Sequence, residues 1–259
     1  MSELRLGDTR KIIKEYADEY FDLVCSDIPY KIATGGVGIN TNTGGILNHK
    51  FTNDRLKNKW LKQHDDDDAN VILIRRGQFF ENIPDFNEWL PEVYRVLKRQ
   101  SHCYLMVNGR NLAELQTKAE AVGFKYQQLL VWVKNNATPN KWFMGKHEMI
   151  LMLRKGREKY INNLGTPNVL VYPNRAGDKW HPNEKPVELM RDLIVNSTNE
   201  GDKVLDPFMG SGSTCLACKQ TNREYYGIEI DEKYYNIAKK RLESEFVSRE
   251  KKSEQISLF

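Results

Sequence analysis

The chain has 259 residues, of which 40% are hydrophobic, and a formal net charge of +4. This size and composition predict a single α/β domain over residues 1–259. The sequence has neither an apolar run of membrane-spanning length nor a charged-then-apolar N-terminal signal segment, so we expect no membrane contact. The cysteines have no disulfide-framework spacing, which favours a reducing, cytoplasmic setting.

The pair Cys215 and Cys218 has the Cys-x-x-Cys spacing of some metal sites. Neither a second pair nor a neighbouring histidine completes a tetrahedral set. Three residues apart on a predicted helix, the two thiols are expected to pack in the core, and we predict no metal site.

The first predicted helix spans Ile12 to Tyr20, where apolar residues recur at helical spacing, with Asp8 or Thr9 as its N-cap. A short, mostly apolar strand at residues 21–25 follows and leads directly into Ser26-Asp27-Ile28-Pro29-Tyr30. An acid and an aromatic residue at a strand's carboxyl end lie where open α/β sheets bind ligands.

Residues 31–78 form a predicted mobile loop region. Up to residue 63 the stretch is rich in Gly, Asn, Thr and Lys, with little periodicity. A lid or substrate clamp and plain disorder both fit this composition. The acidic run Asp65 to Asp68 predicts a solvated segment rather than a cation site.

Strands and helices alternate through the rest of the chain. Helical spacing occurs at residues 90–97, 112–122, 187–194, after residue 213 and at 234–242, and strand-like runs occur at 102–107, 124–133, 148–153, 204–206 and 225–231. This alternation predicts a doubly wound, mostly parallel sheet.

The most basic part of the chain lies between Lys134 and Lys179, which carries nine basic residues against three acids and interleaved aromatic residues. Basic groups with aromatic neighbours suit phosphate contact and base stacking. A solvated basic loop is the alternative interpretation.

A short apolar run ending at Asp206 leads into the closely spaced Gly210 and Gly212 and then a predicted helix start. Glycines let the backbone approach a ligand, and free N–H groups at a helix start favour polar or anionic groups. A lone Gly-x-Gly turn is weak evidence for a ligand site. The next predicted strand, however, ends in the acids Glu229 and Asp231 about twenty residues on, where nucleotide-binding folds place a ribose-binding carboxylate.

Together, four motifs resemble those of the DNA amino-methyltransferases, which transfer a methyl group from S-adenosylmethionine to an exocyclic base nitrogen. Asp27-Ile28-Pro29-Tyr30 is similar to their Asp/Asn/Ser-Pro-Pro-aromatic signature, and Asp206 to Thr214 to their Asp-Pro-Phe-x-Gly-Ser-Gly-Thr-Thr cofactor turn. His181 to Pro186 is similar to His-Pro-x-x-Lys-Pro, and Gly227 to Ile230 to Gly-Ile-Glu-Ile.

The order of these motifs, with the catalytic signature first and the cofactor turn last, resembles the β group of that family. This resemblance implies a permuted, seven-stranded Rossmann-like methyltransferase sheet. It also implies a small inserted target-recognition segment, which we place at residues 134–180.

The resemblance assigns the catalytic chemistry to the first motif. An exocyclic amine is a poor nucleophile, so it needs acceptors for its hydrogens as charge develops on nitrogen. Asp27 and the backbone carbonyl of Ile28, held by Pro29, would be these acceptors, and Tyr30 would stack on the flipped-out base. Ile28 replaces the first proline of the family signature, which makes this turn less rigid.

For the cofactor, the resemblance implies that Glu229 takes the ribose hydroxyls and that Lys185 neutralises the methionine carboxylate. Asp8 lies near the adenine or only caps a helix, Phe208 packs on the adenine or in the core, and His181 orders a turn. The complete predicted cofactor set is Asp8, His181, Lys185, Pro186, Asp206, Phe208, Gly210, Ser211, Gly212, Ser213, Glu229 and Ile230.

The expected function is therefore site-specific N6-adenine methylation of double-stranded DNA, because a leading Asp is typical of the adenine members. N4-cytosine methylation is the nearest alternative, followed by RNA or protein-amide N-methylation and by an inactive DNA-binding relic. A nicotinamide dehydrogenase is disfavoured because no full Gly-x-Gly-x-x-Gly occurs, and C5-cytosine chemistry because no Pro-Cys occurs.

The expected partner is DNA, contacted by Lys134, Lys141, Trp142, Lys146, Arg154, Lys155 and Arg157. A recognition segment this short covers little DNA in one subunit, which favours a homodimer. The sequence favours neither the presence nor the absence of a restriction partner.

Overall fold

The computed structural model describes residues 2–30, 83–138, 143–174 and 184–256. Its contacts divide the chain into a larger unit (residues 1–28, 85–136 and 146–259) and a smaller one (residues 29–84 and 137–145). The predicted loop region at 31–78 lies outside the described residues, as do Lys141, Trp142 and His181. No helix in the described ranges is long and apolar enough to cross a membrane.

The described strands form one mixed sheet. Its spatial order is β1 (Glu3–Leu6), β8 (Glu224–Glu229), β7 (Lys203–Asp206), β2 (Phe21–Asp27), β3 (Leu97–Val107), β5 (Gly145–Lys155), β4 (Lys125–Thr138) and β6 (Val169–Val171). In the spatial run β1-β8-β7-β2-β3, each strand is parallel to the next. Strands β4 and β6 are also parallel, whereas β3 and β5 are antiparallel. The mostly parallel α/β sheet confirms the predicted fold class.

The described part of the sheet has eight strands, where seven were expected. Residues 3–6 add an edge strand beside β8, and β6 lies in a stretch that showed no strand pattern. Both are short edge strands, and three or four residues are too few for a clear alternation of apolar and polar side chains.

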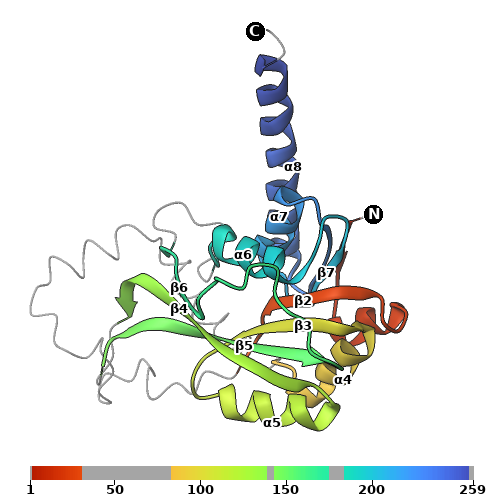
Figure 1. The fold of residues 1–259 in the computed structure, drawn as a ribbon. Helices are drawn as coiled ribbons and strands as arrows, with labels where there is room; N and C mark the ends of the chain where they lie inside the picture. Colours follow the sequence, from red (N-terminus) through yellow and green to blue (C-terminus); the bar gives the residue numbers. More distant parts are fainter. Residues whose placement is uncertain (1, 31–82, 139–142, 175–183, 257–259) are drawn as a thin grey trace, which may run out of the picture. The chain divides into compact units, whose positions relative to one another are not determined.

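Helices cover both faces of this sheet. They are α1 (Thr9–Ile12), the 3₁₀ turn η1 (Ile13–Glu15), α4 (Phe86–Val96), α5 (Leu112–Val122), α6 (Val187–Ser197), α7 (Ser213–Gln220) and α8 (Glu232–Ile256). Helices α4 and α5 lie on one side, and α6, α7 and α8 on the other (Figure 1). The doubly wound arrangement is thus confirmed, and α5 ends at Gly123 in the left-handed conformation, as the sequence predicts.

The predicted N-terminal helix from Ile12 to Tyr20 is wrong in its second half. Helix α1 and turn η1 end at Glu15, and Tyr16 is extended. The guanidinium of Arg95 on α4 donates to the carbonyls of Ile13 and Tyr16, at 3.2 and 2.9 Å, which a continuing helix would need for its own N–H groups. A side chain far away in the sequence therefore ends this helix.

The hydrophobic core lies on both faces of β2. Leu23, Val24 and Cys25 on this strand are at most 1% exposed. Cys215 and Cys218 on α7 are equally buried and belong to the same core cluster, which confirms their predicted packing role.

Position 227, in the middle of β8, should require glycine because the packed core leaves no room for a side chain there. A Cβ atom at this position would collide with Met209 Sδ and would lie 2.8 Å from Cys215 Sγ. Because overpacking a core costs about 1–3 kcal/mol, Gly227→Ala should lower the free energy of unfolding by that amount in urea titrations. In the control Gly109→Ala, the new Cβ lies 3.6 Å from Met149 Cε, and we expect a change within about 1 kcal/mol. Equal effects would contradict the packing argument.

Candidate functional site

The carboxyl ends of β8, β7 and β2 meet at one edge of the sheet, because these neighbouring strands are parallel. Each ends in an acid, namely Glu229, Asp206 and Asp27 respectively. The structure thus brings the predicted catalytic acid beside the predicted cofactor turn, although the two lie at opposite ends of the sequence. Such an edge is where open α/β sheets bind ligands.

A buried hydrogen bond joins the two halves of this site. The Ser26 hydroxyl donates to Asp206 Oδ1 at 2.6 Å, and the Phe208 amide donates to the same oxygen at 3.1 Å. Asp206 is 3% exposed, and this burial raises its pKa to about 6 although Ser26, Thr214 and Phe208 donate to it. Sequence analysis missed Ser26 because a serine at a strand end carries no distinctive pattern.

The glycine turn is open on one side and packed on the other. A Cβ atom on Gly210 (φ +52°) would meet no described atom within 4 Å, whereas one on Gly212 (φ +79°) would approach Ala238 Cβ on α8 at 3.0 Å. Gly210 N–H donates to Glu229 Oε2 at 2.9 Å, and Asp231 N–H donates to Oε1 at 2.8 Å. Burial raises the pKa of Glu229, which these amides oppose.

Behind the turn, Arg241 on α8 is 4% exposed and fixes the backbone. Its Nη1 donates to the Ser211 carbonyl at 3.1 Å and lies 3.2 Å from Ser213 Oγ. Its Nη2 forms an ion pair of 2.6 Å with Glu184, whose side chain is fully buried. The pair ties the turn to the segment of Lys185 and Pro186, the latter being the buried N-cap residue of α6. In the sequence, Arg241 resembles an ordinary surface charge on a helix.

Asp27 lies in a cluster of alternating charges. Lys185 Nζ lies 2.6 Å from Asp27 Oδ2 and 3.3 Å from Glu148 Oε2, and Lys134 Nζ lies 3.1 Å from Glu148 Oε1. Desolvation raises the pKa of Asp27, which Lys185 opposes. For Glu148, burial raises the pKa, but the two ammonium groups outweigh it and the net pKa is lowered. Lys134 and Lys185 thus have protein partners that sequence analysis did not predict.

The remaining candidates near this edge are placed as follows. Asp8 caps α1 by accepting the Arg10 amide at 2.9 Å, as one of its two predicted roles requires. Phe208 packs edge-on against Trp89 at 5.1 Å between ring centroids, and Ile230 is 66% exposed just beyond β8.

Pro29 and Tyr30 belong to the smaller contact unit, whereas Asp27 and Ile28 belong to the larger one. Ile28, 2% exposed, directly follows β2 and is anchored in the core.

Three predicted DNA contacts lie at the end of β5 that is remote from Asp27. Strand β5 runs antiparallel to β3, so Lys146 begins it near the Asp27 edge, and Arg154 and Lys155 end it about 30 Å away, with Arg157 just beyond. Lys155 is also 7% exposed and donates to the carbonyls of Tyr94 and Leu97 at 2.8 and 2.7 Å. The DNA contacts of these three residues stay predictions, as does that of Lys146, which is exposed.

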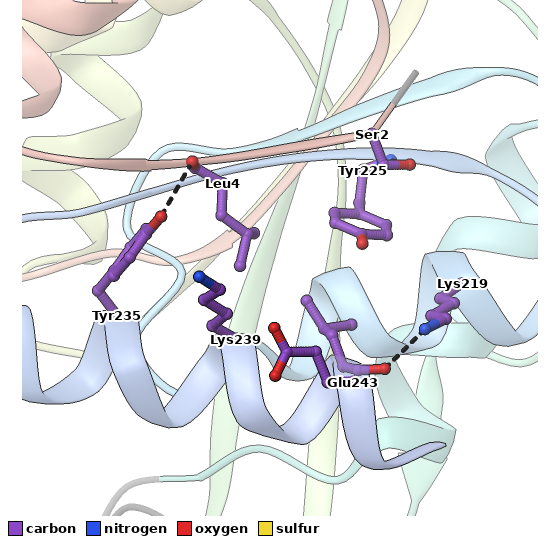
Figure 2. Close-up of a pocket in the computed structure, with 8 residues that line it drawn as sticks. Ser2, Leu4, Lys219, Tyr225, Tyr235, Lys239 and Glu243 are labelled. Carbon is purple, nitrogen blue, oxygen red and sulfur yellow. Dashed lines mark hydrogen bonds between the residues drawn. The ribbon is translucent and has the colours of Figure 1, made fainter. Parts of the chain in front are cut away.

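A cavity of about 520 Å³ lies elsewhere, against β1, β8, α7 and α8 (Figure 2). Leu4 and Tyr225 contribute apolar surface, and Lys239 and Glu243 contribute charges. None of the predicted site residues lines it, so the cavity has no part in the site at the strand ends.

The family model described as DNA methylase matches residues 21–240. The chain belongs to the DNA methylase family. A similar relative is the type II methyltransferase M2.DpnII of Streptococcus pneumoniae, 30% identical over 92% of this chain and 88% of its own.

Two solved structures share the fold of this DNA methylase. An M1.HpyAVI–SAM complex has a TM-score of 0.64 and 24% identity, covering 93% of this chain and all of its own. The cytosine-N4-specific PvuII DNA methyltransferase also has a TM-score of 0.64, with 16% identity, covering 92% of this chain and 84% of its own.

The raised pKa of Asp206 predicts a pH-dependent stability. Between about pH 4 and pH 6 the folded protein keeps a proton on Asp206 that the unfolded chain releases, so stability falls as the pH rises through this range. A shift of about two pKa units corresponds to about 3 kcal/mol. Urea titrations should show that the free energy of unfolding of Asp206→Asn, minus that of the wild type, grows by about this amount from about pH 3 to about pH 7. A pH-independent difference would contradict the assignment.

Proposed function

We propose that this DNA methylase is a site-specific N6-adenine methyltransferase that acts on double-stranded DNA with S-adenosylmethionine as methyl donor. The observation that carries the proposal is the buried Ser26–Asp206 hydrogen bond, which places the Asp27 signature beside the glycine turn. A methyl transfer needs its acceptor and donor in contact, and adjacent strand ends supply two neighbouring sites for them.

The residues at the glycine turn fit S-adenosylmethionine. The open space above Gly210 allows a ligand to approach the backbone, and Glu229 at the end of β8 presents a carboxylate suited to a ribose diol. Asp206 and the backbone of residues 210–212 would hold the methionine part. When bound, this cofactor supplies an activated methyl group on a positively charged sulfur. The M1.HpyAVI complex with the same cofactor, on the same fold, supports the assignment.

On the base side, Asp27 would accept one hydrogen of the exocyclic amine through its carboxylate. The carbonyl of Ile28 would accept the other, and burial of the Ile28 side chain holds this backbone firmly although the family's first proline is absent. Tyr30 would stack on the base after it leaves the duplex. Lys146, with Lys141 and Trp142 outside the described residues, would contact the DNA.

N4-cytosine methylation is the second candidate function. The fold similarity to the cytosine-N4-specific PvuII enzyme is as high as that to M1.HpyAVI, so the fold does not discriminate between the two bases. The leading Asp27 favours adenine. A homodimer and a cytoplasmic location remain parts of the proposal, and it includes no particular restriction partner.

Asp27→Asn tests the catalytic assignment. The amide keeps the shape but loses the charge that stabilises the amine as it becomes positive, so we expect methyl transfer to fall by about 10²–10⁴-fold. Mass analysis of nucleosides from DNA incubated with enzyme and S-adenosylmethionine measures the product. N6-methyladenine formed by the wild type supports the proposal, N4-methylcytosine selects the second candidate, and no methylated nucleoside refutes both.

Glu229→Gln tests the cofactor site. A neutral amide hydrogen-bonds a ribose diol less strongly than a carboxylate, so calorimetry should show the Kd for S-adenosylmethionine rising by about tenfold. The matched control is Asp231→Asn, because Asp231 caps α8 by accepting the Lys233 amide at 2.8 Å. Equal affinity loss in both variants would contradict a specific role for Glu229.

A further inference from the structure

Lys185 contacts the first residue of the catalytic signature. Its ammonium lies 2.6 Å from Asp27 Oδ2 and 3.3 Å from Glu148 Oε2, and its side chain is 10% exposed. An ammonium group has three N–H donors, and two of its neighbours here are anions. The charge of Lys185 is therefore directed at the catalytic signature.

The cluster is assembled from distant parts of the sequence. Asp27 ends β2, Glu148 lies near the start of β5, and Lys185 directly precedes Pro186, the N-cap residue of α6. Lys134 on β4 holds the other oxygen of Glu148 at 3.1 Å, so Glu148 is fixed between two cations. Its remaining freedom is small, and it keeps Lys185 in contact with Asp27 rather than with solvent.

We propose that Lys185 and Glu148 form a positioning pair for Asp27, which orients its carboxylate and keeps it ionised for the amine of the base. In this proposal Lys185 binds Oδ2 of Asp27, and the second oxygen, Oδ1, is left to accept a hydrogen of the amine. The inference rests on the proposed function, because it assigns Asp27 its role as acceptor.

The physical need for the pair follows from the surroundings of Asp27. Desolvation favours the protonated acid, and a protonated Asp27 would be a poor acceptor. The anion Glu148 also raises the pKa of Asp27. Among the described residues Lys185 is the cation that opposes both effects, and Lys134 acts only through Glu148.

Lys185→Met should raise the pKa of Asp27, by about one unit for the loss of a contacting cation. A ¹³C NMR titration of the Asp27 carboxyl, assigned by its absence in Asp27→Asn, measures this in the full-length protein without turnover. The apparent pKa of the acid limb in the pH profile of kcat should rise by the same amount. The Kd for S-adenosylmethionine, measured by calorimetry, should stay within about twofold.

The double variant separates charge from general damage. Glu148 raises the pKa of Asp27, so adding Glu148→Gln to Lys185→Met should move the NMR pKa and the acid limb part of the way back toward the wild type. Two damaging substitutions without this electrostatic relation would not compensate each other. Lys185→Arg, which keeps the charge, should hold the acid limb near its wild-type position even if kcat falls.

The matched control is Lys203→Met, which removes a lysine at the opposite end of β7, where Nζ lies 3.8 Å from the centre of the Tyr20 ring. Lys203→Met should change neither the NMR pKa of Asp27 nor the acid limb of the pH profile of kcat. An unchanged Asp27 pKa in folded Lys185→Met, checked by circular dichroism, would overturn the inference and leave the proposed function intact. A tenfold weaker cofactor affinity without a pKa shift would instead make Lys185 a cofactor ligand. If no DNA is methylated but the NMR shift occurs, the positioning pair stands and the proposed function fails.

Discussion

The hydrogen bond from Ser26 to Asp206 is the contact on which the site depends. It spans 2.6 Å between β2 and β7, and both residues are at most 3% exposed, so water cannot replace either partner. Neighbouring strands lie about 4.8 Å apart, so fixing their ends against each other places Asp27 beside the glycine turn. The proposed donor and acceptor sites are thereby held by the core of the sheet.

This arrangement crowds three acids at one edge, and burial raises the pKa of each. The structure stabilises them in different ways. Asp206 accepts hydrogen bonds from neutral groups, Glu229 accepts two backbone amides, and Asp27 contacts the ammonium of Lys185. The electrostatic difference suits the different roles proposed for them, because a cation keeps a carboxylate ionised more effectively than a neutral donor does.

Local sequence patterns predicted much of the fold. Helix α5 begins and ends where its spacing and Gly123 indicate, and the alternation of strands with helices gave the doubly wound sheet. The predicted N-terminal helix was too long because a distant side chain intervened. The guanidinium of Arg95 donates to the carbonyls of Ile13 and Tyr16, where the helix ends. The antiparallel direction of β5 places Lys155 at the end of that strand remote from Asp27. Neither effect produces a local sequence pattern in the residues concerned.

By itself the sequence determined that the acids of the site lie near the carboxyl ends of strands, because an apolar run that leads into an acid is a local pattern. It also determined the family, through four motifs in one order. Only the tertiary structure decided that Lys185 faces Asp27 and Glu148, and that Arg241 supports the turn. Through-space partners of charged side chains depend on strand order and direction, which no local pattern encodes.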